Sequence, residues 1–193
     1  MDICIYGASS SRLDPVYYAD AEKLGRLIAE NGHGLVFGGG REGLMGAAAR
    51  GAHSAGGRIV GIAPKFFDEP GILYEHCTEL VYTETMRERK ALMEERSDAC
   101  IVLPGGIGTF EEFFEILTLK QLGQSDRAIV MLNTADYYAP LQALLESMAE
   151  RKFMSAECLT LYAVADTPEK ALDCIASYTP RTGSIRRLSD YSR

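Results

Sequence analysis

The chain alternates between short apolar runs and longer segments in which apolar residues recur every three or four positions. An apolar run of four or five residues is typical of a strand covered on both faces of a parallel sheet. The longer periodic segments are typical of amphipathic helices. We expect strands at Asp2–Tyr6, Gly34–Phe37, Arg58–Ile62, Glu79–Tyr82, Ala99–Leu103, Ala128–Leu132 and Leu161–Val164. We expect helices over residues 15–31, 43–56, 84–97, 109–122, 136–151 and 167–178.

This alternation of strands and helices predicts an α/β fold, a single domain with a doubly wound parallel sheet and helices on both faces. The domain is expected to span residues 1–178. Residues 179–193 carry four arginines against one aspartate, which predicts a basic C-terminal extension. The stretch Pro64–Tyr74 holds two prolines and a glycine, and it is expected to be a long loop.

Composition and charge narrow the function classes. With 193 residues, 47% of them hydrophobic, the chain can bury a core without disulfides or a structural metal. A net charge of −7 argues against nucleic acid as a partner. The five cysteines form no CxxC pair, so we expect neither a metal nor a redox centre, and no cofactor. Neither a signal peptide nor an apolar run of about 18 residues occurs, so we expect a cytoplasmic protein without a membrane partner.

Three strand-to-helix connections are built from small residues: Gly7–Ser11, Gly38–Gly43 and Pro104–Thr109. The carboxyl ends of parallel strands share one edge of the sheet, where ligands of this fold class bind. Free N–H groups and the helix dipole favour an anion at such turns. Small residues also serve simply to make tight turns, and each turn taken alone allows that explanation. Three of them at one edge favour a ligand that contains phosphate.

The second turn contains a literal G-x-G-x-x-G at Gly38, Gly40 and Gly43, which suggests a dinucleotide. The next strand, however, leads into Ala63-Pro64-Lys65, without the acidic residue that would bind a ribose hydroxyl. No G-x-x-x-x-G-K-[ST] and no G-x-S-x-G is present. The sequence therefore gives weak support to a dinucleotide, and it excludes a P-loop.

Two cations stand where the helical pattern expects apolar residues. Arg89 and Lys90 follow Met86 by three and four positions and precede Met93 by four and three. Helical spacing places them on the face of these methionines, and a buried cation needs a partner. The alternative is an ordinary surface helix whose many charged residues form salt bridges around it.

The segment after the third turn offers a carboxylate with two possible roles. An apolar stripe expected to be core runs through Phe110, Phe113, Phe114 and Leu117. Glu112 points away from this stripe. Thr109 and Glu112 have the spacing of a capping box that starts a helix. The functional alternative places the Glu112 carboxylate beside bound phosphate, where it would contact ribose hydroxyls or a cationic sugar.

Taken together, the segments Gly38–Gly46, Arg89-Lys90 and Pro104–Glu112 resemble the LONELY GUY family of cytokinin-activating phosphoribohydrolases. The resemblance extends to about Tyr178. It implies a Rossmann-like fold, a homodimer or higher homo-oligomer, and a small-molecule nucleoside monophosphate as partner. The implied reaction cleaves the N-glycosidic bond of cytokinin riboside 5′-monophosphates, and of AMP, giving free base and ribose 5-phosphate.

The resemblance and the three turns also assign residues. Arg89 and Glu112 would be the catalytic pair. The substrate-binding residues would be Ser9, Gly39, Gly40, Lys90, Gly105, Gly106, Ile107, Gly108, Thr109 and Thr118. The family's acidic contact would fall on Glu69, in a loop that departs from the family pattern. Arg87 stands where the family usually has histidine.

Two further expectations concern the class of protein and its assembly. Some relatives with similar glycine turns only carry molybdenum cofactor, so the alternative function is a non-catalytic nucleotide or molybdenum-cofactor-type binding protein. Others have been labelled lysine decarboxylases, a reaction that these residues do not support. The surplus of apolar residues over 109–122 predicts a twofold homodimer centred on 84–97 and 109–122. Alternatively, the loop that carries Phe66 and Phe67 covers this surface within one chain.

Overall fold

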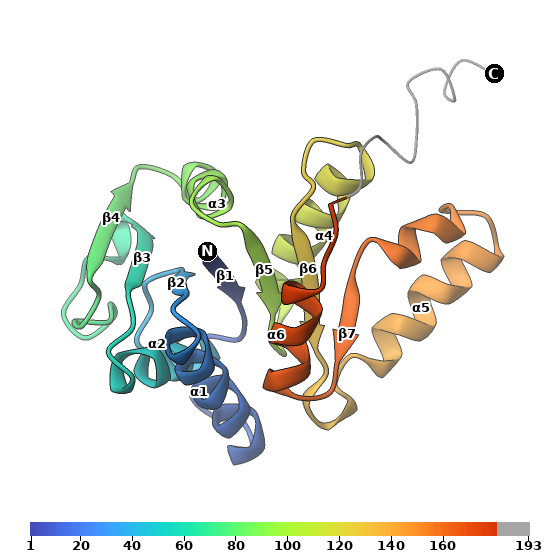
Figure 1. Ribbon diagram of the computed structural model, residues 1–193. Coiled ribbons are helices and arrows are strands. Elements are labelled where there is room, and N and C mark those ends of the chain that lie inside the picture. Colours follow the sequence, from blue (N-terminus) through green and yellow to red (C-terminus); the bar gives the residue numbers. More distant parts are fainter. Residues whose placement is uncertain (181–193) are drawn as a thin grey trace.

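The computed structural model describes residues 1–180, so most of the expected basic extension, residues 181–193, lies outside the described part (Figure 1). Seven parallel strands form one sheet in the order β4-β3-β2-β1-β5-β6-β7. They are β1 (Asp2–Tyr6), β2 (Gly34–Phe37), β3 (Ile59–Pro64), β4 (Glu79–Thr83), β5 (Ala99–Val102), β6 (Ala128–Leu132) and β7 (Ala163–Ala165). The order grows outward from β1 in one direction and from β5 in the other. The predicted doubly wound sheet is confirmed, and its switch point lies between β1 and β5.

The described residues form six α-helices, of which five connect successive strands and the last follows β7. They are α1 (Pro15–Glu30), α2 (Gly43–Ser54), α3 (Met86–Glu95), α4 (Ile107–Gln121), α5 (Ala139–Glu150) and α6 (Pro168–Ala176). Short 3₁₀ turns occupy Lys65–Phe67, Thr134–Asp136 and Ala156–Thr160. The predicted elements all exist, but some ends were wrong. The helix predicted from residue 109 begins at Ile107, and the one predicted from 136 begins at Ala139, after the second 3₁₀ turn.

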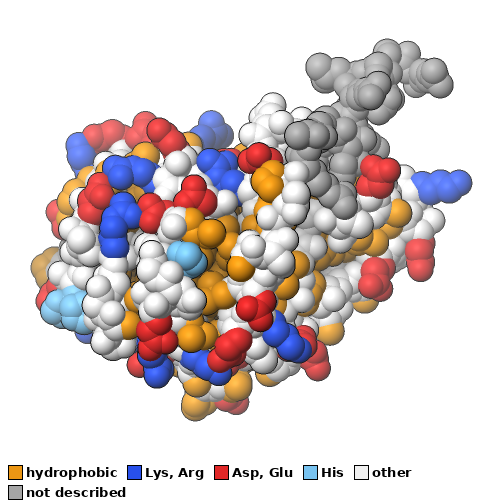
Figure 2. Space-filling model, viewed as in Figure 1, with side chains coloured by type: hydrophobic (Ala, Val, Ile, Leu, Met, Phe, Trp, Pro, Cys, Tyr) orange, Lys and Arg blue, Asp and Glu red, His pale blue; other side chains and the backbone are white. Residues whose placement is uncertain are grey.

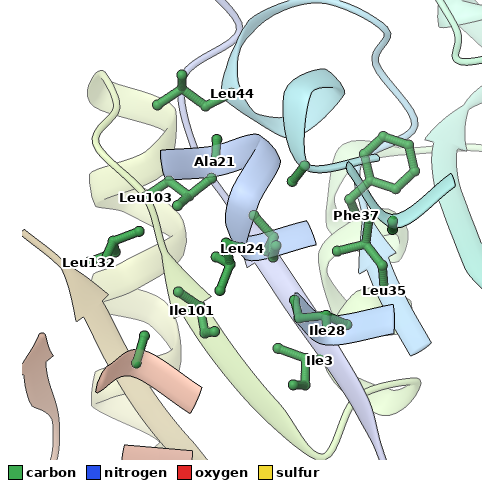
Figure 3. Close-up of a cluster of buried hydrophobic side chains, with 14 of the residues drawn as sticks. Ile3, Ala21, Leu24, Ile28, Leu35, Phe37, Leu44, Ile101, Leu103 and Leu132 are labelled. Carbon is green, nitrogen blue, oxygen red and sulfur yellow. The ribbon is translucent and has the colours of Figure 1, made fainter. Parts of the chain in front are cut away.

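The strands bury both faces, as their continuous apolar runs predict. Ile3 and Ile5 point into a core shared with α1, α2 and α6, whereas Cys4 and Tyr6 point into the core on the side of α3, α4 and α5. Figure 3 shows the first core, with Leu24 of α1 directed at the strand residues. Helices therefore cover both faces of the sheet.

Strand register brings the glycine turns together. Tyr6, the last residue of β1, is aligned with Val102, the last residue of β5. Ile5 is aligned with Phe37 at the end of β2. The three turns consequently leave the sheet side by side at its carboxyl edge.

The surface mixes both signs of charge. On the face in Figure 2, basic and acidic side chains are interspersed around a band of exposed hydrophobic ones. Among the described residues, no helix has the length and apolar character needed to cross a membrane.

Candidate active site

Backbone hydrogen bonds join the three glycine turns into one cradle. The Ala8 N–H donates to the Pro104 carbonyl at 3.0 Å, and the Leu44 N–H donates to the Ala8 carbonyl at 2.8 Å. Gly43 has a φ of +66°, and a Cβ there would lie 2.1 Å from the Ala8 oxygen. Only glycine allows the second turn to approach the first this closely.

The second turn is also tied to the loop that precedes β4. Tyr74 N–H donates to the Gly39 carbonyl at 2.8 Å, and Gly40 forms an isolated bridge with Leu73. Glu69 lies on this loop with an exposed side chain, beside an open cavity of about 450 Å³. The loop is thus a side wall of the cradle, and Glu69 stays a predicted contact.

The third turn opens directly into α4. Gly106 is the N-cap and contributes no side-chain cap, and the first α-helical bond runs from the Phe110 N–H to the Gly106 carbonyl at 3.0 Å. The N–H groups of Ile107, Gly108 and Thr109 come before that bond, so helix geometry gives them no intrahelical acceptor. An anion placed at this end would accept from them.

The predicted capping box at Thr109 is wrong. Thr109 is the third residue of α4, not its cap, and its side chain is buried beneath the turn. A Cβ on Gly105 would lie 2.1 Å from Thr109 Oγ1, so the glycine and the threonine fit each other. The capping box of this region is at the start of α3, between Thr85 and Glu88. Glu112 is left available for another role.

Glu112 instead meets Arg89 across the gap between α4 and α3. Arg89 Nη1 lies 3.3 Å from Glu112 Oε1, and Arg89 Nε donates to the Ile62 carbonyl at 3.1 Å. Arg89 is only 4% exposed. The surface-helix alternative is therefore wrong for Arg89, and Lys90 beside it is also mostly covered, with 13% of its side chain exposed, whereas Arg87 and Glu88 are exposed. A buried arginine and carboxylate stand next to the cradle.

Burial sets the proton affinity of the carboxylate. It raises the pKa of Glu112 to about 6, although the nearby Arg89 guanidinium acts to lower it. Glu112 is therefore mostly ionised at neutral pH but gains a proton far more easily than an exposed glutamate. A pKa near the working pH suits a group that exchanges protons.

Gly38 is a site residue that the sequence analysis named only as part of a motif. A Cβ there would lie 1.7 Å from Arg89 Nη2, so the guanidinium occupies the space a side chain would need. Gly38 belongs to the G-x-G-x-x-G match, but nothing in that motif indicates an arginine above it. The contact joins the end of β2 to α3, which are far apart in the sequence.

Two tyrosines behind the third turn were also missed. Tyr137 Oη donates to the Gly105 carbonyl at 2.5 Å, and Tyr138 Oη donates to the Leu103 carbonyl at 2.6 Å. The only available sign was a pair of tyrosines soon after β6, at the ligand edge of the sheet. The Tyr137 hydroxyl binds the backbone of the third turn, whereas the Tyr138 hydroxyl binds the backbone just before that turn.

The connection that carries these tyrosines is strained. Ala135 and Asp136 have φ of 52° and 57°, the left-handed region, which costs a non-glycine residue about 1–2 kcal/mol. Asn133 compensates, because its Oδ1 accepts from the Tyr138 N–H at 2.7 Å and its Nδ2 donates to Asp136 at 3.2 Å. Strain held in this way is common beside functional sites.

Comparison with known proteins identifies the family of this chain. The sequence model of a family described as "Possible lysine decarboxylase" matches residues 45–175. A Rhodococcoides fascians protein named cytokinin riboside 5′-monophosphate phosphoribohydrolase is 42% identical over 158 residues, 81% of this chain and 80% of that one. A Mycobacterium tuberculosis protein of the same name is 39% identical over 156 residues, 81% and 83% of the two chains. The chain belongs to the LONELY GUY family.

Solved structures resemble the fold more broadly. The molybdenum cofactor carrier protein of Chlamydomonas reinhardtii is 22% identical, with a TM-score of 0.70 over 91% of this chain and 95% of that one. The molybdenum cofactor binding protein of Rippkaea orientalis is 23% identical, with a TM-score of 0.69 over 91% and 94%. At these identities the likeness shows the fold alone. The names of the LONELY GUY relatives support the hydrolase interpretation and not the carrier alternative.

The structure gathers most of the predicted site of this LONELY GUY protein. The backbone of the cradle contains Ser9, Gly39, Gly40, Gly105, Gly106, Ile107, Gly108 and Thr109. Lys90 instead pairs with Glu111 and Glu115 on α4, the second pair at 2.8 Å. Thr118 donates its hydroxyl to the Phe114 carbonyl at 2.7 Å, about 14 Å along α4 from Thr109. These two predicted contacts therefore lie outside the chain's own cradle.

No metal centre emerges from the geometry. Within residues 1–180, His, Cys, Asp and Glu side chains nowhere gather in a group of three or more that suits a metal ion. The expectation that the reaction needs neither metal nor cofactor stays a prediction.

Proposed function

We propose that the protein hydrolyses the N-glycosidic bond of cytokinin riboside 5′-monophosphates, and of AMP, to free base and ribose 5-phosphate. The observation that carries this proposal is the buried Arg89–Glu112 pair beside the open N-terminus of α4. The names of the family relatives support the substrate class.

The cradle would hold the 5′-phosphate. The unpartnered N–H groups at the start of α4 supply donors, and the helix dipole favours the negative charge. The substrate's ribose would then extend toward Glu112, which lies one turn further along the helix from Gly108.

Bond cleavage needs stabilisation of positive charge on the sugar. As the C1′–N bond breaks, its electron pair leaves with the base, and the ribose acquires oxocarbenium character. The Glu112 carboxylate stabilises this cation and takes the proton of the water whose oxygen attacks C1′. The departing base takes a proton from solvent, and Glu112 afterwards returns its proton to solvent. Arg89 holds the carboxylate in place and supplies positive charge for the phosphate or for the departing base.

The test is release of base. The protein is incubated with N6-isopentenyladenosine 5′-monophosphate, with AMP and with the two corresponding ribosides, and free base is measured by chromatography. We expect release from the monophosphates over many turnovers and little from the ribosides, because these have no anion for the cradle. Many turnovers would also exclude the non-catalytic carrier.

Variants assign the roles. Arg89→Ala and Glu112→Ala should each lower turnover by orders of magnitude while the circular dichroism spectrum stays native. A folded variant with near wild-type release would remove that residue from the mechanism. Equal rates on riboside and monophosphate would contradict the phosphate cradle.

We also propose a homodimer centred on α3 and α4. Phe113 and Leu117 are buried as predicted, but Phe114 is 37% exposed, so the predicted core stripe is partly wrong. Ile107 and Leu122 are exposed as well, and their spacing of seven and eight residues from Phe114 places all three on one face.

The loop that carries Phe66 and Phe67 leaves this face exposed within one chain, and Phe66 is itself 58% exposed. Thr118 belongs to the same face of α4 as Phe114, so it would reach substrate only in a second subunit's site. The exposed Arg87 of α3 would likewise reach substrate in the second subunit's site. Light scattering tests the assembly: a monomeric mass near 21.1 kDa contradicts it, and Phe114→Glu should dissociate the dimer.

A further inference from the structure

The peptide between Gly105 and Gly106 must face one way for the cradle to work. All described peptide bonds are trans, so the Gly105 carbonyl and the Gly106 N–H point in opposite directions. Two consecutive glycines have no Cβ to oppose rotation of the peptide between them. A rotated peptide would turn a carbonyl oxygen toward the phosphate in place of a donor.

Tyr137 holds this peptide by a hydrogen bond to its carbonyl. Its hydroxyl donates to the Gly105 carbonyl at 2.5 Å. Its ring is set edge-on against Tyr17, with centroids 6.2 Å apart, and against Tyr138 at 5.1 Å. These ring contacts restrict Tyr137, which is 37% exposed and lines a cavity of about 270 Å³ together with Gly105 and Gly106. Because the peptide is trans, the Gly106 N–H points away from the Gly105 carbonyl that Tyr137 binds.

We propose that Tyr137 is a positioning residue for phosphate binding, which keeps the Gly106 N–H directed into the cradle. The proposal rests on the proposed function, because it needs a phosphate in the cradle. Tyr137 acts through the backbone and not on the reacting bond, so its loss should weaken substrate binding more than the chemical step.

Tyr138 provides a matched comparison, because it binds the backbone just before the same turn. Its hydroxyl donates to the Leu103 carbonyl at 2.6 Å, and burial raises its pKa, so it stays a donor. The peptide that follows Leu103 ends in Pro104, which has no N–H. Tyr138 therefore fixes the backbone without directing a donor to the ligand.

The experiment compares Tyr137→Phe with Tyr138→Phe. Calorimetry measures the Kd of ribose 5-phosphate and of inorganic phosphate, and steady-state kinetics give kcat and KM on AMP. We expect Tyr137→Phe to raise the Kd of both ligands and the KM about tenfold. This is the cost of losing one hydrogen bond to a charged group, here the bond from the Gly106 N–H to the phosphate. Its kcat should change little. Tyr138→Phe should lower Tm and leave Kd and KM unchanged.

Several outcomes overturn the proposal. An unchanged Kd and KM in Tyr137→Phe would do so, and so would an equal rise in both variants, which would indicate general loosening of the turn. Tyr17→Phe, which keeps the ring against Tyr137, replaces the control if Tyr138→Phe fails to fold. Failure of the proposed function is separate, because it shows as wild type that binds ribose 5-phosphate but releases no base. Wild type that binds neither ligand overturns both.

Discussion

The helix pairs on the two faces of the sheet are held together by different interactions. α1 and α2 pack backbone against backbone, since a Cβ on Gly25 would lie 1.8 Å from the Ala48 carbonyl oxygen. α3 and α4 are joined by charges, with the buried pair of Arg89 and Glu112 between them. One face of the sheet is an apolar core throughout, and the other contains ionised groups beside the ligand edge.

This difference separates stability from chemistry. Close apolar packing is the main source of folding stability, because it removes surface from water and leaves few voids. A buried ion pair is a weak source, since the cost of desolvating both charges offsets their attraction. The α1–α2 face is therefore expected to carry the stability, and the charges between α3 and α4 to serve the reaction.

The largest expected effect comes from removing the buried charges, which tests whether they serve the reaction and not stability. The double variant Arg89→Met with Glu112→Leu should lower turnover at least about 1000-fold, or about 4 kcal/mol in the barrier. Its free energy of unfolding should stay equal or rise, because apolar residues pack without desolvation cost. Base release and urea unfolding measure the two effects. Arg89→Met alone, the control, leaves a buried carboxylate unpaired and should be less stable than the double variant. An unfolded double variant would show that the charges hold this face together.

On the α1–α2 face, a substitution should have the opposite effect and lower stability without lowering activity. Gly51→Ala places a Cβ 1.9 Å from the Glu22 carbonyl of α1, so the two backbones must separate. We expect a loss of about 3 kcal/mol of unfolding free energy, with unchanged turnover per folded molecule. Arg50→Ala, at the exposed neighbouring position, should change stability by about 0.5 kcal/mol or less. If Gly51→Ala is as stable as wild type, close approach of α1 and α2 is not what holds this face.

Within the site itself, one added methyl group should be enough to lower activity. Gly38→Ala would displace the Arg89 guanidinium, and misplacement of a catalytic group by about 1 Å costs roughly 100-fold in rate. Gly61→Ala on the adjacent strand is the control, because its closest contacts are the movable ends of Leu80 and Cys77, at 2.9 and 3.0 Å, and the Gly39 backbone is at an ordinary contact distance of 3.4 Å. Kinetics on AMP should show a 10- to 100-fold loss for Gly38→Ala only, by the same estimate of about 1 Å. Equal losses would mean that Arg89 tolerates movement.

The smallest expected effect is the pH dependence of stability. The pKa of Glu112 is raised from 4.5 to about 6 in the folded protein. The contribution of Glu112 to the free energy of unfolding is therefore fully present below pH 4.5. It is lost as the pH rises through 6, by about 2 kcal/mol in total. Urea unfolding of wild type and Glu112→Gln at pH 4 and pH 8 measures it.

The difference in unfolding free energy between these two proteins should shift by about 2 kcal/mol in favour of Glu112→Gln at the higher pH. Arg89→Met, which removes a charge that lowers this pKa, should move the change to still higher pH. A pH-independent difference would show that burial does not perturb Glu112.

Much of this molecule followed from local patterns in the sequence. The apolar runs located all seven strands, and their continuity predicted helices on both faces, because residues facing either core had to be apolar. The glycine turns were recognisable for the same kind of reason, since they directly follow the runs that end at Tyr6, Phe37 and Leu103. Helical spacing indicated an inward-facing Arg89, and the place of Glu112 after the third turn suggested a site carboxylate, whereas their assignment as a catalytic pair followed from the resemblance.

What the sequence by itself determined was therefore the set of elements and the edge of the sheet that carries the candidate site, both of which depend on residues near one another in the chain. Only the tertiary structure decided which groups meet there. Because α4 starts with Gly106 as its N-cap, Glu112 does not cap the helix and instead contacts Arg89. Strand order places Gly38 against the guanidinium of that arginine. The same order brought Tyr137 behind the third turn. Such contacts join residues far apart in sequence, and neither spacing nor periodicity carries information about them.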